Sequence, residues 1–371
     1  MPHPLAQFIP DQYQQQLDKK VARVKALFTP FTSLEPVIYP STTRHFRQRA
    51  EFRLWHDDNG CHYAMFDPDE PKQPICIEHF PIASEKISNI MQPLLAELNA
   101  NSLLKHRLFQ VEFLSSLRGE LLITLVYHKP LDEQWEAEEK SLEAKLGIMV
   151  IGRARKQKKV LTRDWINETL TIAEESFHYR QYEGGFTQPN AKVNEQMITW
   201  ACQQCEATAN DLLELYCGNG NFTLPLSRHY RRVLATEVSK TSIAAAKYNC
   251  QENDVTNITF VRLSSEETTQ ALNQEREFRR LAQIDLDEYQ FSTVFVDPPR
   301  AGLDQTTLDL VAQFDHIIYI SCNPVTLAEN LQTLNLSHSI DAFALFDQFP
   351  YTEHCECGVS LRRRKNTKHH T

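Results

Sequence analysis

The sequence predicts an α/β protein with two parts, a parallel sheet in the second half and a smaller α+β domain before it. After about residue 182, helical patterns alternate with short, almost fully apolar strands, which is typical of a parallel sheet covered on both faces. Between about residues 41 and 180, short strand-like runs mix with helical ones. The length of 371 residues allows two hydrophobic cores.

Composition narrows the class of protein further. Apolar residues make up 42% and charged residues 23%, which is ordinary globular usage and excludes disordered or collagen-like chains. No run approaches the ~20 apolar residues of a membrane span, and the first residues do not resemble a secretion signal. The nine cysteines form no regular framework, so we expect reduced thiols and a cytoplasmic protein. We expect no metal, because Cys202 and Cys205 read as helix residues without a second pair at zinc spacing.

The chain order predicts three segments. Apolar residues at spacings of three and four predict an amphipathic helix over 11–28, ending before Pro30, within a helical lead segment of residues 1–40. Residues 41–180 form the α+β domain, with helices around 84–99 and 132–146. Residues 181–371 form the sheet domain, with strands at 211–216, 231–237, 258–263, 292–297 and 316–321.

The first of these strands runs into a glycine turn that suggests a ligand crevice. Gly218 and Gly220 let the backbone turn sharply and approach a ligand at the carboxyl end of a strand. A dinucleotide fingerprint needs a third glycine where Thr223 stands, which disfavours NAD. Glu237 ends the next strand, where a carboxylate can accept hydrogen bonds from both ribose hydroxyls. The combination fits S-adenosylmethionine better than a dinucleotide, while an ordinary tight turn is the plain alternative.

Two later strands deliver reactive groups to the same crevice. Asp297 ends one strand before two prolines, and Cys322 ends another before Asn-Pro. Ligands of open α/β sheets bind outside these carboxyl ends, so both should lie near Gly218 and Glu237. A thiolate that adds to C6 of a pyrimidine makes C5 nucleophilic toward a methyl donor, and a base must then remove the C5 proton. We expect nearby positive charge or donors to lower the pKa of Cys322; Glu353 and Glu356 both remain candidates for the base.

Six stretches together carry a family resemblance. They are FTQPN (186–190), LLELYCGNGNFTL (212–224), LATE (234–237), VFVDPPRAGLD (294–304), YISCNP (319–324) and FDQFPYTEHCECGV (346–359). With them the chain resembles the RNA uracil-5-methyltransferases, and within these the bacterial tRNA (uracil-5-)-methyltransferases that make ribothymidine in the T-loop. The resemblance covers nearly the full length.

The resemblance implies a Rossmann-like, S-adenosylmethionine-dependent methyltransferase sheet with an added strand hairpin at 344–349 and 359–364, and an α+β RNA-binding domain. It implies that Cys322 is the nucleophile and that Glu356, rather than Glu353, accepts the proton. It also implies that the methyl donor is surrounded by Gln188, Tyr216, Asn221, Glu237 and Asp297. The substrate is expected to be the T-arm of tRNA, and plausibly the similar arm of transfer-messenger RNA (tmRNA). Ribosomal-RNA members of the family carry an iron–sulfur cysteine cluster, and only Cys61 and Cys76 precede Cys202 here, so we expect no such centre.

RNA binding must come from local clusters, because the net charge is −9 and residues 41–180 hold 19 basic and 21 acidic side chains. Basic groups contact phosphates and aromatic faces stack on splayed bases. The RNA-binding candidates are Arg44, Arg47, Arg49, Phe52, Arg53 and Phe109, with a second basic group at 153–159. Solvated charge and ordinary core packing are the plain readings of these residues.

Three other functions stay open at this point. The first is methylation of ribosomal-RNA uridine, and the second is a tRNA-folding chaperone that binds the T-arm without chemistry. The third is a Rossmann dehydrogenase, disfavoured by the missing glycine. Nothing in the sequence implies a membrane or a protein partner.

Overall fold

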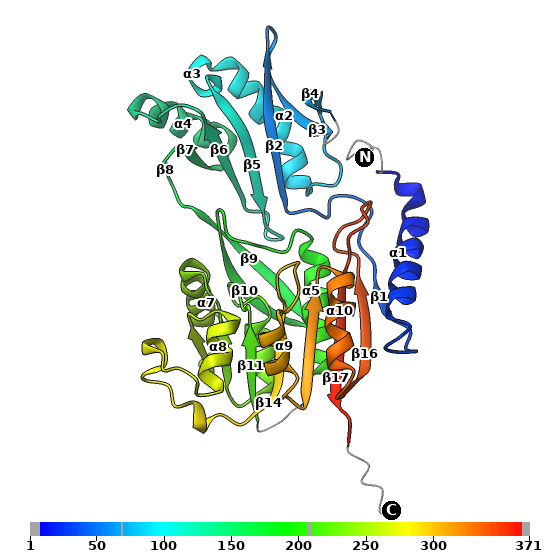
Figure 1. Cartoon of the computed structure of the whole chain (residues 1–371). Coiled ribbons are helices and arrows are strands. Elements are labelled where there is room, and N and C mark those ends of the chain that lie inside the picture. The colour runs from blue at the N-terminus through cyan, green and yellow to red at the C-terminus, as the bar shows by residue number, and fades with distance from the viewer. Residues whose placement is uncertain (1–7, 68–69, 207–209, 366–371) are drawn as a thin grey trace, which may run out of the picture. The chain divides into compact units, whose positions relative to one another are not determined.

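The computed structural model describes residues 8–67, 70–206 and 210–365, which divide into two compact units (Figure 1). The first unit takes the described residues up to 13 with 42–170 and 180–191; the second takes 14–41, 171–179 and the described residues from 192 onward. The units therefore differ from the three predicted segments, since most of the lead segment packs with the second unit. The reason is visible in its contacts, described below.

The first unit is built on a seven-stranded sheet in the order β4-β3-β2-β5-β6-β7-β8. Helices α2, α3 and α4 connect its strands, as the sequence predicts for the two longer helices. The elements are β2 (Arg49–Asp57), β3 (Gly60–Asp67), β4 (Glu70–Cys76), α2 (Glu85–Ala100), α3 (Ser102–Lys105), β5 (Leu108–Ser115), β6 (Leu121–Tyr127), α4 (Glu133–Leu146), β7 (Met149–Ala154) and β8 (Gln157–Val160). A separate hairpin, β9 (Trp165–Ile172) and β10 (Glu175–Tyr182), follows.

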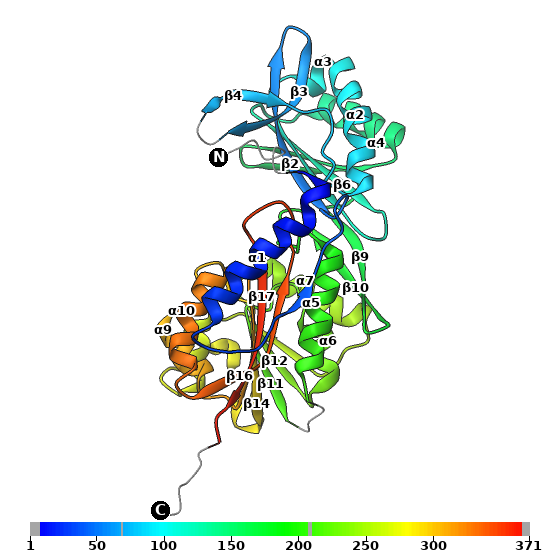
Figure 2. The same ribbon diagram turned by 90° about the vertical axis from the view of Figure 1, so that its right-hand side faces the viewer.

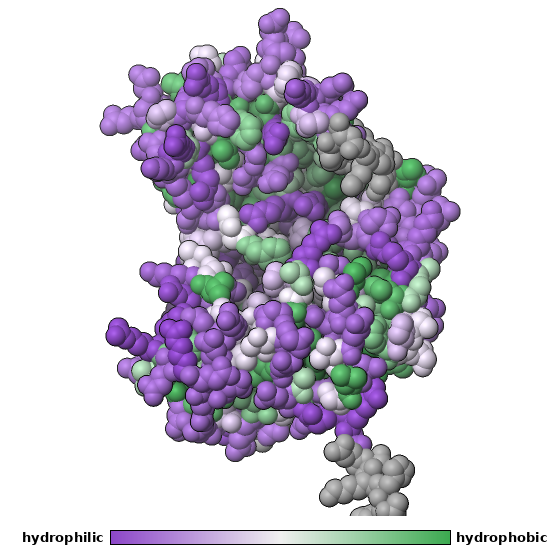
Figure 3. All heavy atoms as spheres, viewed as in Figure 1, coloured by the Kyte–Doolittle hydropathy of each residue, from purple (hydrophilic) through white to green (hydrophobic). Residues whose placement is uncertain are grey.

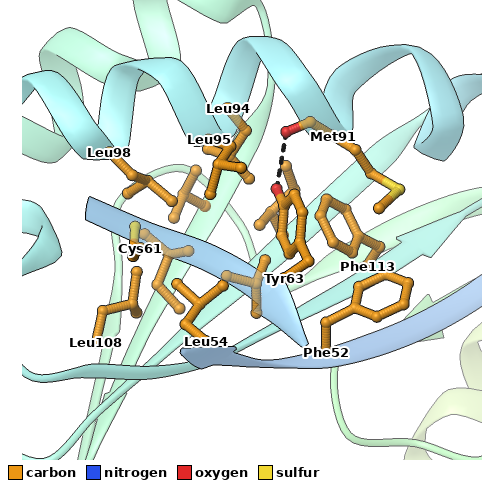
Figure 4. Close-up of a cluster of buried hydrophobic side chains, with 14 of the residues drawn as sticks. Phe52, Leu54, Cys61, Tyr63, Met91, Leu94, Leu95, Leu98, Leu108 and Phe113 are labelled. Atoms are coloured by element: carbon orange, nitrogen blue, oxygen red, sulfur yellow. Dashed lines mark hydrogen bonds between the residues drawn. The ribbon is translucent and has the colours of Figure 1, made fainter. Parts of the chain in front are cut away.

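The core of the first unit lies between α2 and the sheet. Figure 4 shows Met91, Leu94, Leu95 and Leu98 of α2 facing side chains of β2, β3 and β5. The hydroxyl of Tyr63, which is fully buried, donates to the carbonyl of Met91 at 2.9 Å, so its polar atom is satisfied within the apolar cluster. The helix begins at Ser84, whose side chain accepts from the amide of Ile87.

The second unit is built on an eight-stranded mixed sheet in the order β1-β16-β17-β15-β14-β11-β12-β13. Its strands are β1 (Val37–Tyr39), β11 (Asp211–Leu215), β12 (Val233–Thr236), β13 (Ile258–Val261), β14 (Phe291–Val296), β15 (His316–Ser321), β16 (His338–Phe346) and β17 (Glu356–Arg363). Its helices are α1 (Tyr13–Phe28), α5 (Ala191–Gln204), α6 (Thr223–Leu226), α7 (Lys240–Glu252), α8 (Ser265–Leu272), α9 (Gln305–Val311) and α10 (Pro324–Leu334), with short 3-10 turns at Pro10–Gln12, Ser227–His229, Arg279–Leu281 and Leu286–Glu288.

The strands of this sheet are parallel except β17, which runs antiparallel between β15 and β16. Figures 1 and 2 show α5, α6 and α7 on one face and α8, α9 and α10 on the other. The sequence prediction of a parallel sheet covered on both faces is confirmed for the strands from β11 to β15. The hairpin expected at 344–349 and 359–364 is present as the antiparallel pair β16 and β17, but its first strand begins and ends earlier than predicted, and 347–349 lie outside it.

The lead segment belongs to this second sheet. Strand β1 pairs with β16, and the ring of Phe28 at the end of α1 stacks on Phe343 with centroids 4.7 Å apart. Lys20, 3% exposed, donates to the carboxylate of Asp347 at 2.6 Å and to the carbonyl of Phe349 at 2.8 Å. A buried ion pair with a second acceptor therefore ties α1 to the turn that follows β16.

No helix in the described parts of the chain is both long enough and apolar enough to cross a membrane. Figure 3 shows one face of the molecule, on which hydrophilic residues predominate and hydrophobic ones lie in small separate patches.

Candidate active site

The predicted crevice residues follow the carboxyl ends of neighbouring strands in the second unit. Leu215 at the end of β11 lies opposite Thr236 of β12 and Val296 of β14. The next residues along these strands are Tyr216, Glu237 and Asp297, so one step of register brings the three to the same edge. Their side chains come from three strands, yet they border the same end of the sheet, as the sequence predicts.

The glycine turn after β11 leaves space above its backbone. Gly218 has φ +55° with nothing within 4 Å of where a Cβ would lie, so that side of the turn is open. Gly220 has φ +85°, and a Cβ there would come within 2.6 Å of Leu224. Asn221, next in the turn, exchanges two side-chain hydrogen bonds of 2.9 Å with Asn194 of α5, and its carbonyl accepts from the hydroxyl of Tyr179 at 3.0 Å. The contacts of Asn221 thus hold the turn in place, while the space next to Gly218 stays open.

Two backbone amides hold the carboxylate of Glu237 next to this turn. One carboxylate oxygen accepts from the amide of Gly218 at 3.1 Å and the other from the amide of Ser239 at 2.7 Å. Each oxygen keeps a free lone pair, so the carboxylate can still accept two hydroxyl donors from a ligand.

The carboxyl groups of Asp297 and Glu214 lie close enough to interact electrostatically. Burial raises the pKa of Asp297 to about 7 and that of Glu214 to about 8, and the charge of Asp297 adds to the shift of Glu214. Among the described residues, Oε2 of Glu214 has no hydrogen-bond partner. The sequence analysis missed Glu214, although an acidic residue in the middle of a strand buried on both faces is a usable signal.

Cys322 follows β15 at the same edge. Asn323 caps helix α10 by accepting from the amide of Val325 at 3.2 Å, which stops the strand and leaves the half-buried thiol at the turn. Burial and the charges of Glu356 and Asp297 raise the pKa of Cys322 to about 11, against a smaller opposing effect of Arg300. The expectation of a lowered thiol pKa is therefore wrong for the protein without ligands, because the nearest charges are carboxylates.

Glu356 lies across from Cys322. Ser321 pairs with Cys357 on antiparallel β17, so the next pair in register is Cys322 with Glu356. Glu356 is 2% exposed, its Oε2 has no partner within the described residues, and burial together with Asp297 raises its pKa well above the usual range. Glu353 instead has a side chain 83% exposed and pairs with Arg23 at 2.8 Å. Burial beside the thiol separates the two candidate bases, which spacing in the sequence could not.

A cavity of about 510 Å³ opens beside Cys322. Its lining comes from α1, from the loop after β14, from the start of α10 and from the loop before β17. The lining residues are Arg23, Val24, Leu27, Arg300, Cys322, Asn323, Pro324, Val325, Glu353 and His354. The thiol thus faces a space that a ring-sized ligand can enter.

Gln188 belongs to the first unit, in the loop after β10. Its buried Oε1 has no hydrogen-bond partner in the described part of the chain. An orphaned amide oxygen of this kind is a group that a ligand can satisfy.

Most of the RNA-binding candidates lie at the surface of the first unit. Arg44 is exposed over the ring of Phe8, and Arg53 lies between the rings of Phe66 and Phe109, 5.2 and 5.7 Å from their centroids. Phe109 is half-buried and stacks on exposed His128 with centroids 4.3 Å apart. The histidine was not singled out in the sequence analysis.

Two of the arginines are engaged with the backbone. Arg47 donates to the carbonyl of Arg49 at 2.8 Å, and burial lowers its pKa. Arg49 donates to the carbonyl of Gly185 at 2.7 Å. These contacts hold the residues in place and leave other guanidinium donors for a phosphate.

The stacking role predicted for Phe52 is wrong. The ring is 2% exposed and meets the rings of Tyr63, Phe80 and Phe113, as Figure 4 shows for two of them. On alternating β2 it points to the core, while Arg53 points to solvent. A ring packed on its faces in this way has no free surface for a base.

The second basic group is largely neutralised within the protein. Arg153 pairs with Glu183, Lys158 with Asp164 at 2.7 Å, and Lys159 with Glu136. Arg155 and Lys156 are exposed at the turn between β7 and β8. Of the second basic group, Arg155 and Lys156 are therefore the residues exposed without an ion pair given above.

Groups of three or more His, Cys, Asp or Glu side chains that could hold a metal ion are absent from the described residues. Cys202 is buried on α5 as predicted, whereas Cys205, also expected in the helix, lies one residue beyond its end.

The arrangement is an α/β protein with a half-buried thiol, a buried carboxyl group and a glycine turn at one end of the sheet. Its fold is similar to that of the Pyrococcus abyssi tRNA (uracil-54, C5)-methyltransferase solved in complex with S-adenosyl-L-homocysteine. The TM-score is 0.73 at 19% identity, over 94% of this chain and 83% of that one.

Sequence comparison gives the family. Residues 12–364 match the family described as tRNA (Uracil-5-)-methyltransferase. The chain is 56% identical to a tRNA/tmRNA (uracil-C(5))-methyltransferase of Aromatoleum aromaticum, over 97% of this chain and 98% of that protein. It is 54% identical to the protein of that name from Saccharophagus degradans, over 97% and 99%. The chain belongs to the tRNA (uracil-5-)-methyltransferase family, which confirms the resemblance found in the sequence.

Proposed function

We propose that the protein transfers a methyl group from S-adenosylmethionine to C5 of the T-loop uridine of tRNA, and of the equivalent uridine of tmRNA. The family gives the reaction class, and relatives more than half identical to this chain act by name on tRNA and tmRNA. The single structural observation that supports the mechanism is the register of β15 and β17. One step beyond the Ser321–Cys357 pair it sets Cys322 opposite Glu356, whose buried Oε2 has no partner among the described residues.

The residues of the crevice fit the methyl donor. The open face of Gly218 leaves room for a ligand to approach the backbone, and Glu237 retains acceptor capacity for two ribose hydroxyls. Tyr216, Gly220, Asn221 and Asp297 border the same turn. The family resemblance adds Gln188, whose buried Oε1 has no partner among the described residues. S-adenosylmethionine, when bound, supplies an electrophilic methyl group on a positively charged sulfur.

Cys322 makes the pyrimidine carbon reactive. Its sulfur forms a bond to C6 of uracil, and the electrons of the C5–C6 double bond move toward O4, which leaves C5 nucleophilic. The thiol proton must leave as the bond forms, because the raised pKa keeps the group protonated at neutral pH. The neighbouring carboxylate of Asp297 can take this proton, which leaves Glu356 unprotonated for the later step.

Glu356 completes the reaction. After C5 has been methylated, the carboxylate removes the C5 proton, the double bond re-forms and the sulfur leaves C6 as thiolate. Glu356 must be ionised to do this, and positive charge in the crevice favours the ionised form of a buried carboxyl group. Its position across from Cys322 gives it access to the carbon next to the one that the sulfur attacks.

The first unit is the proposed RNA-binding domain. Arg44, Arg47, Arg49 and Arg53 supply guanidinium groups for phosphates, and Phe109 supplies a ring for a splayed base. A base stacked in the loop is out of reach of a thiol, so the uridine must be extruded, at a cost of a few kcal/mol. All nine cysteines are free thiols, which fits a reducing cytoplasm as the site of the reaction.

Trapping the adduct tests the proposal. Fluorine at C5 cannot leave as a proton, so 5-fluorouracil-substituted tRNA should remain bonded to the protein and migrate more slowly in a denaturing gel. The same RNA should label no peptide but the one containing Cys322. Ribosomal RNA serves as the competing substrate, and methylation of ribosomal RNA alone would refute the choice of tRNA.

Two substitutions separate the proposed steps. Cys322→Ala should bind tRNA but form neither adduct nor product, and full methylation by this variant would rule out the adduct mechanism. Glu356→Gln should accumulate the adduct on unmodified tRNA and lower turnover by at least about 100-fold, in the range of general-base catalysis. Glu353→Gln is the matched control and should stay close to the parent rate, since Glu353 is exposed and paired with Arg23.

A further inference from the structure

Two arginines line the cavity beside Cys322. Arg23 belongs to α1 and Arg300 to the loop after β14, and His354 of the loop before β17 lines the cavity with them. Glu353 is the acidic residue of the lining, and it already pairs with Arg23 at 2.8 Å. In the described parts of the chain Arg300 has no acidic partner; its side chain meets Nδ1 of His354 at 3.3 Å.

The backbone holds Arg300 next to the Cys322 turn. Its carbonyl accepts from Nδ2 of Asn323 at 3.2 Å and from the hydroxyl of Thr326 at 3.3 Å. Asn323 and Thr326 flank the start of α10, directly after the thiol. The two prolines before Arg300 stiffen the other side of this connection. The backbone of Arg300 is therefore held beside Cys322, while its side chain is exposed.

His354 orients the guanidinium rather than competing with it for an anion. Arginine has only donors, so Nδ1 of His354 must be the acceptor in this contact. Burial and the nearby charges of Arg300, Lys20 and Arg23 lower the pKa of His354, which keeps the ring neutral at physiological pH. A neutral histidine can hold one N–H of Arg300 and leave the other donors of the fork free.

The chemistry of the proposed adduct places a phosphate near this group. A uracil joined to Cys322 through C6 carries its ribose on the adjacent N1, so the nucleotide backbone must pass through or along the same cavity. A guanidinium fork matches a phosphate by two parallel hydrogen bonds. We propose that Arg300, held by His354, binds a phosphate flanking the target uridine and so holds the nucleotide in the cavity beside Cys322. This inference rests on the proposed function.

The test removes the negative charge of the phosphate, the positive charge of Arg300, or both at once. T-arm RNAs are made with a methylphosphonate linkage on the 5′ or the 3′ side of the target uridine, and methylation is followed with the whole protein. Arg300→Gln should raise KM about tenfold on unmodified RNA, the size of one charge-assisted contact, with kcat nearly unchanged. One of the two modified RNAs should raise KM equally for the parent protein and cause no further loss with Arg300→Gln.

Two supporting measurements sharpen the outcome. The slope of log KM against log salt should fall by about 0.7 to 1 in Arg300→Gln, as expected when one phosphate contact is lost. Arg300→Lys should recover part of the affinity but not the bidentate geometry. Arg279→Gln is the control, because Arg279 is an exposed arginine of the same unit that does not line the cavity beside Cys322.

Additive losses would overturn the inference, since both modified RNAs would then weaken Arg300→Gln as much as the parent. A change confined to kcat and to the pH dependence of adduct formation would also overturn it, by showing that Arg300 acts on the thiol. Adduct formation with 5-fluorouracil RNA is recorded for the parent protein in the same series. If the parent forms no adduct, the proposed function has failed, and that result is distinguishable from a failure confined to Arg300.

Discussion

At the scale of single residues, the site combines groups whose protons are held more tightly than usual. Cys322, Asp297, Glu214 and Glu356 share one crevice, and burial raises the pKa of each. Carboxylates that lie close together cannot all ionise without a compensating positive charge. The arrangement therefore favours a cationic ligand, and the raised pKa of Cys322 keeps most of the thiol protonated at neutral pH.

The raised pKa of the thiol predicts slow alkylation in the protein without ligands. A pKa of about 11 means that the thiolate fraction of Cys322 grows about tenfold for each pH unit between 7 and 9. The rate of iodoacetamide labelling of the Cys322 peptide, followed by mass spectrometry, should rise accordingly without a plateau. The Cys76 peptide, from an exposed cysteine, serves as an internal reference. A plateau below pH 8 would show that the thiol is activated without ligands.

A second residue far from this chemistry predicts how stability depends on pH. Glu139 of α4 is fully buried, and neither of its carboxylate oxygens has a partner among the described residues. Burial raises its pKa from 4.5 to about 8, so the folded protein holds a proton that the unfolded chain releases above pH 4.5. Stability should therefore fall as pH rises from about 4.5 to 8, by at most about 1.4 kcal/mol per unit from this group.

Glu139→Gln removes the titrating proton while keeping the shape of the side chain. In urea unfolding followed by fluorescence, the variant should lose this downward slope and become more stable relative to the parent as pH approaches 8. An unchanged slope in the variant would mean that Glu139 is ionised in the folded protein.

At the scale of elements, helix α1 is predictable from its sequence but its role is not. Tyr13, Leu17, Val24 and Phe28 give the apolar stripe that predicts the helix, and all four are buried. Lys20 breaks that pattern, since a lysine is expected at the surface. Its buried pairing with Asp347, over 300 positions away, depends on a long-range contact that no local pattern encodes.

The ion pair predicts a strong asymmetry between single and double substitutions. Lys20→Met leaves the carboxylate of Asp347 buried without its cation, and should lower stability by about 3–5 kcal/mol. Lys20→Met combined with Asp347→Leu removes both charges and should recover most of the loss. Thermal melts of the three proteins measure this, and equal losses in the single and double variants would contradict a coupled pair.

Glu353 and Glu356 are a second case in which the local sequence was not sufficient and a long-range strand pairing was needed. Their spacing from the strand is equally plausible for a base, and only the antiparallel register of β17 on β15 sets Glu356 across from Cys322. Periodicity could predict the strands, the helices and the residues at the strand ends. It could not predict the edge strand β1, which has three residues and depends on a partner distant in sequence. The burial of Phe52 did have a local signal, because Ala50, Phe52 and Leu54 alternate with polar residues along β2.

At the scale of the whole molecule, each unit is assembled from separate stretches of chain. The second unit needs residues 14–41 and 171–179 in addition to the long C-terminal stretch. The boundaries expected at residues 40 and 180 follow changes in sequence pattern, whereas the compact units follow which segments pack together. A cut at either position would therefore divide a unit rather than separate two domains.

Deletion tests this organisation. Removal of residues 1–41 takes away α1 and β1, exposes the edge of β16 and leaves Asp347 without Lys20. We expect such a protein to aggregate or to melt well below the full chain, because an unpaired edge strand and an unpaired buried charge are both destabilising. Removal of residues 1–7 alone is the control and should be tolerated. Normal melting of the longer deletion would show that the second sheet is stable without its lead segment.

Because Val37 pairs with Ala344, strand β1 must wait for its partner strand during synthesis of the chain. At 5–20 residues per second, a ribosome finishes the partner of β1 roughly 15 to 60 seconds after β1 itself has emerged. Throughout that interval the amphipathic face of the first helix has no native surface to cover it. The nascent chain is therefore a client for chaperones that shield apolar helices until translation ends.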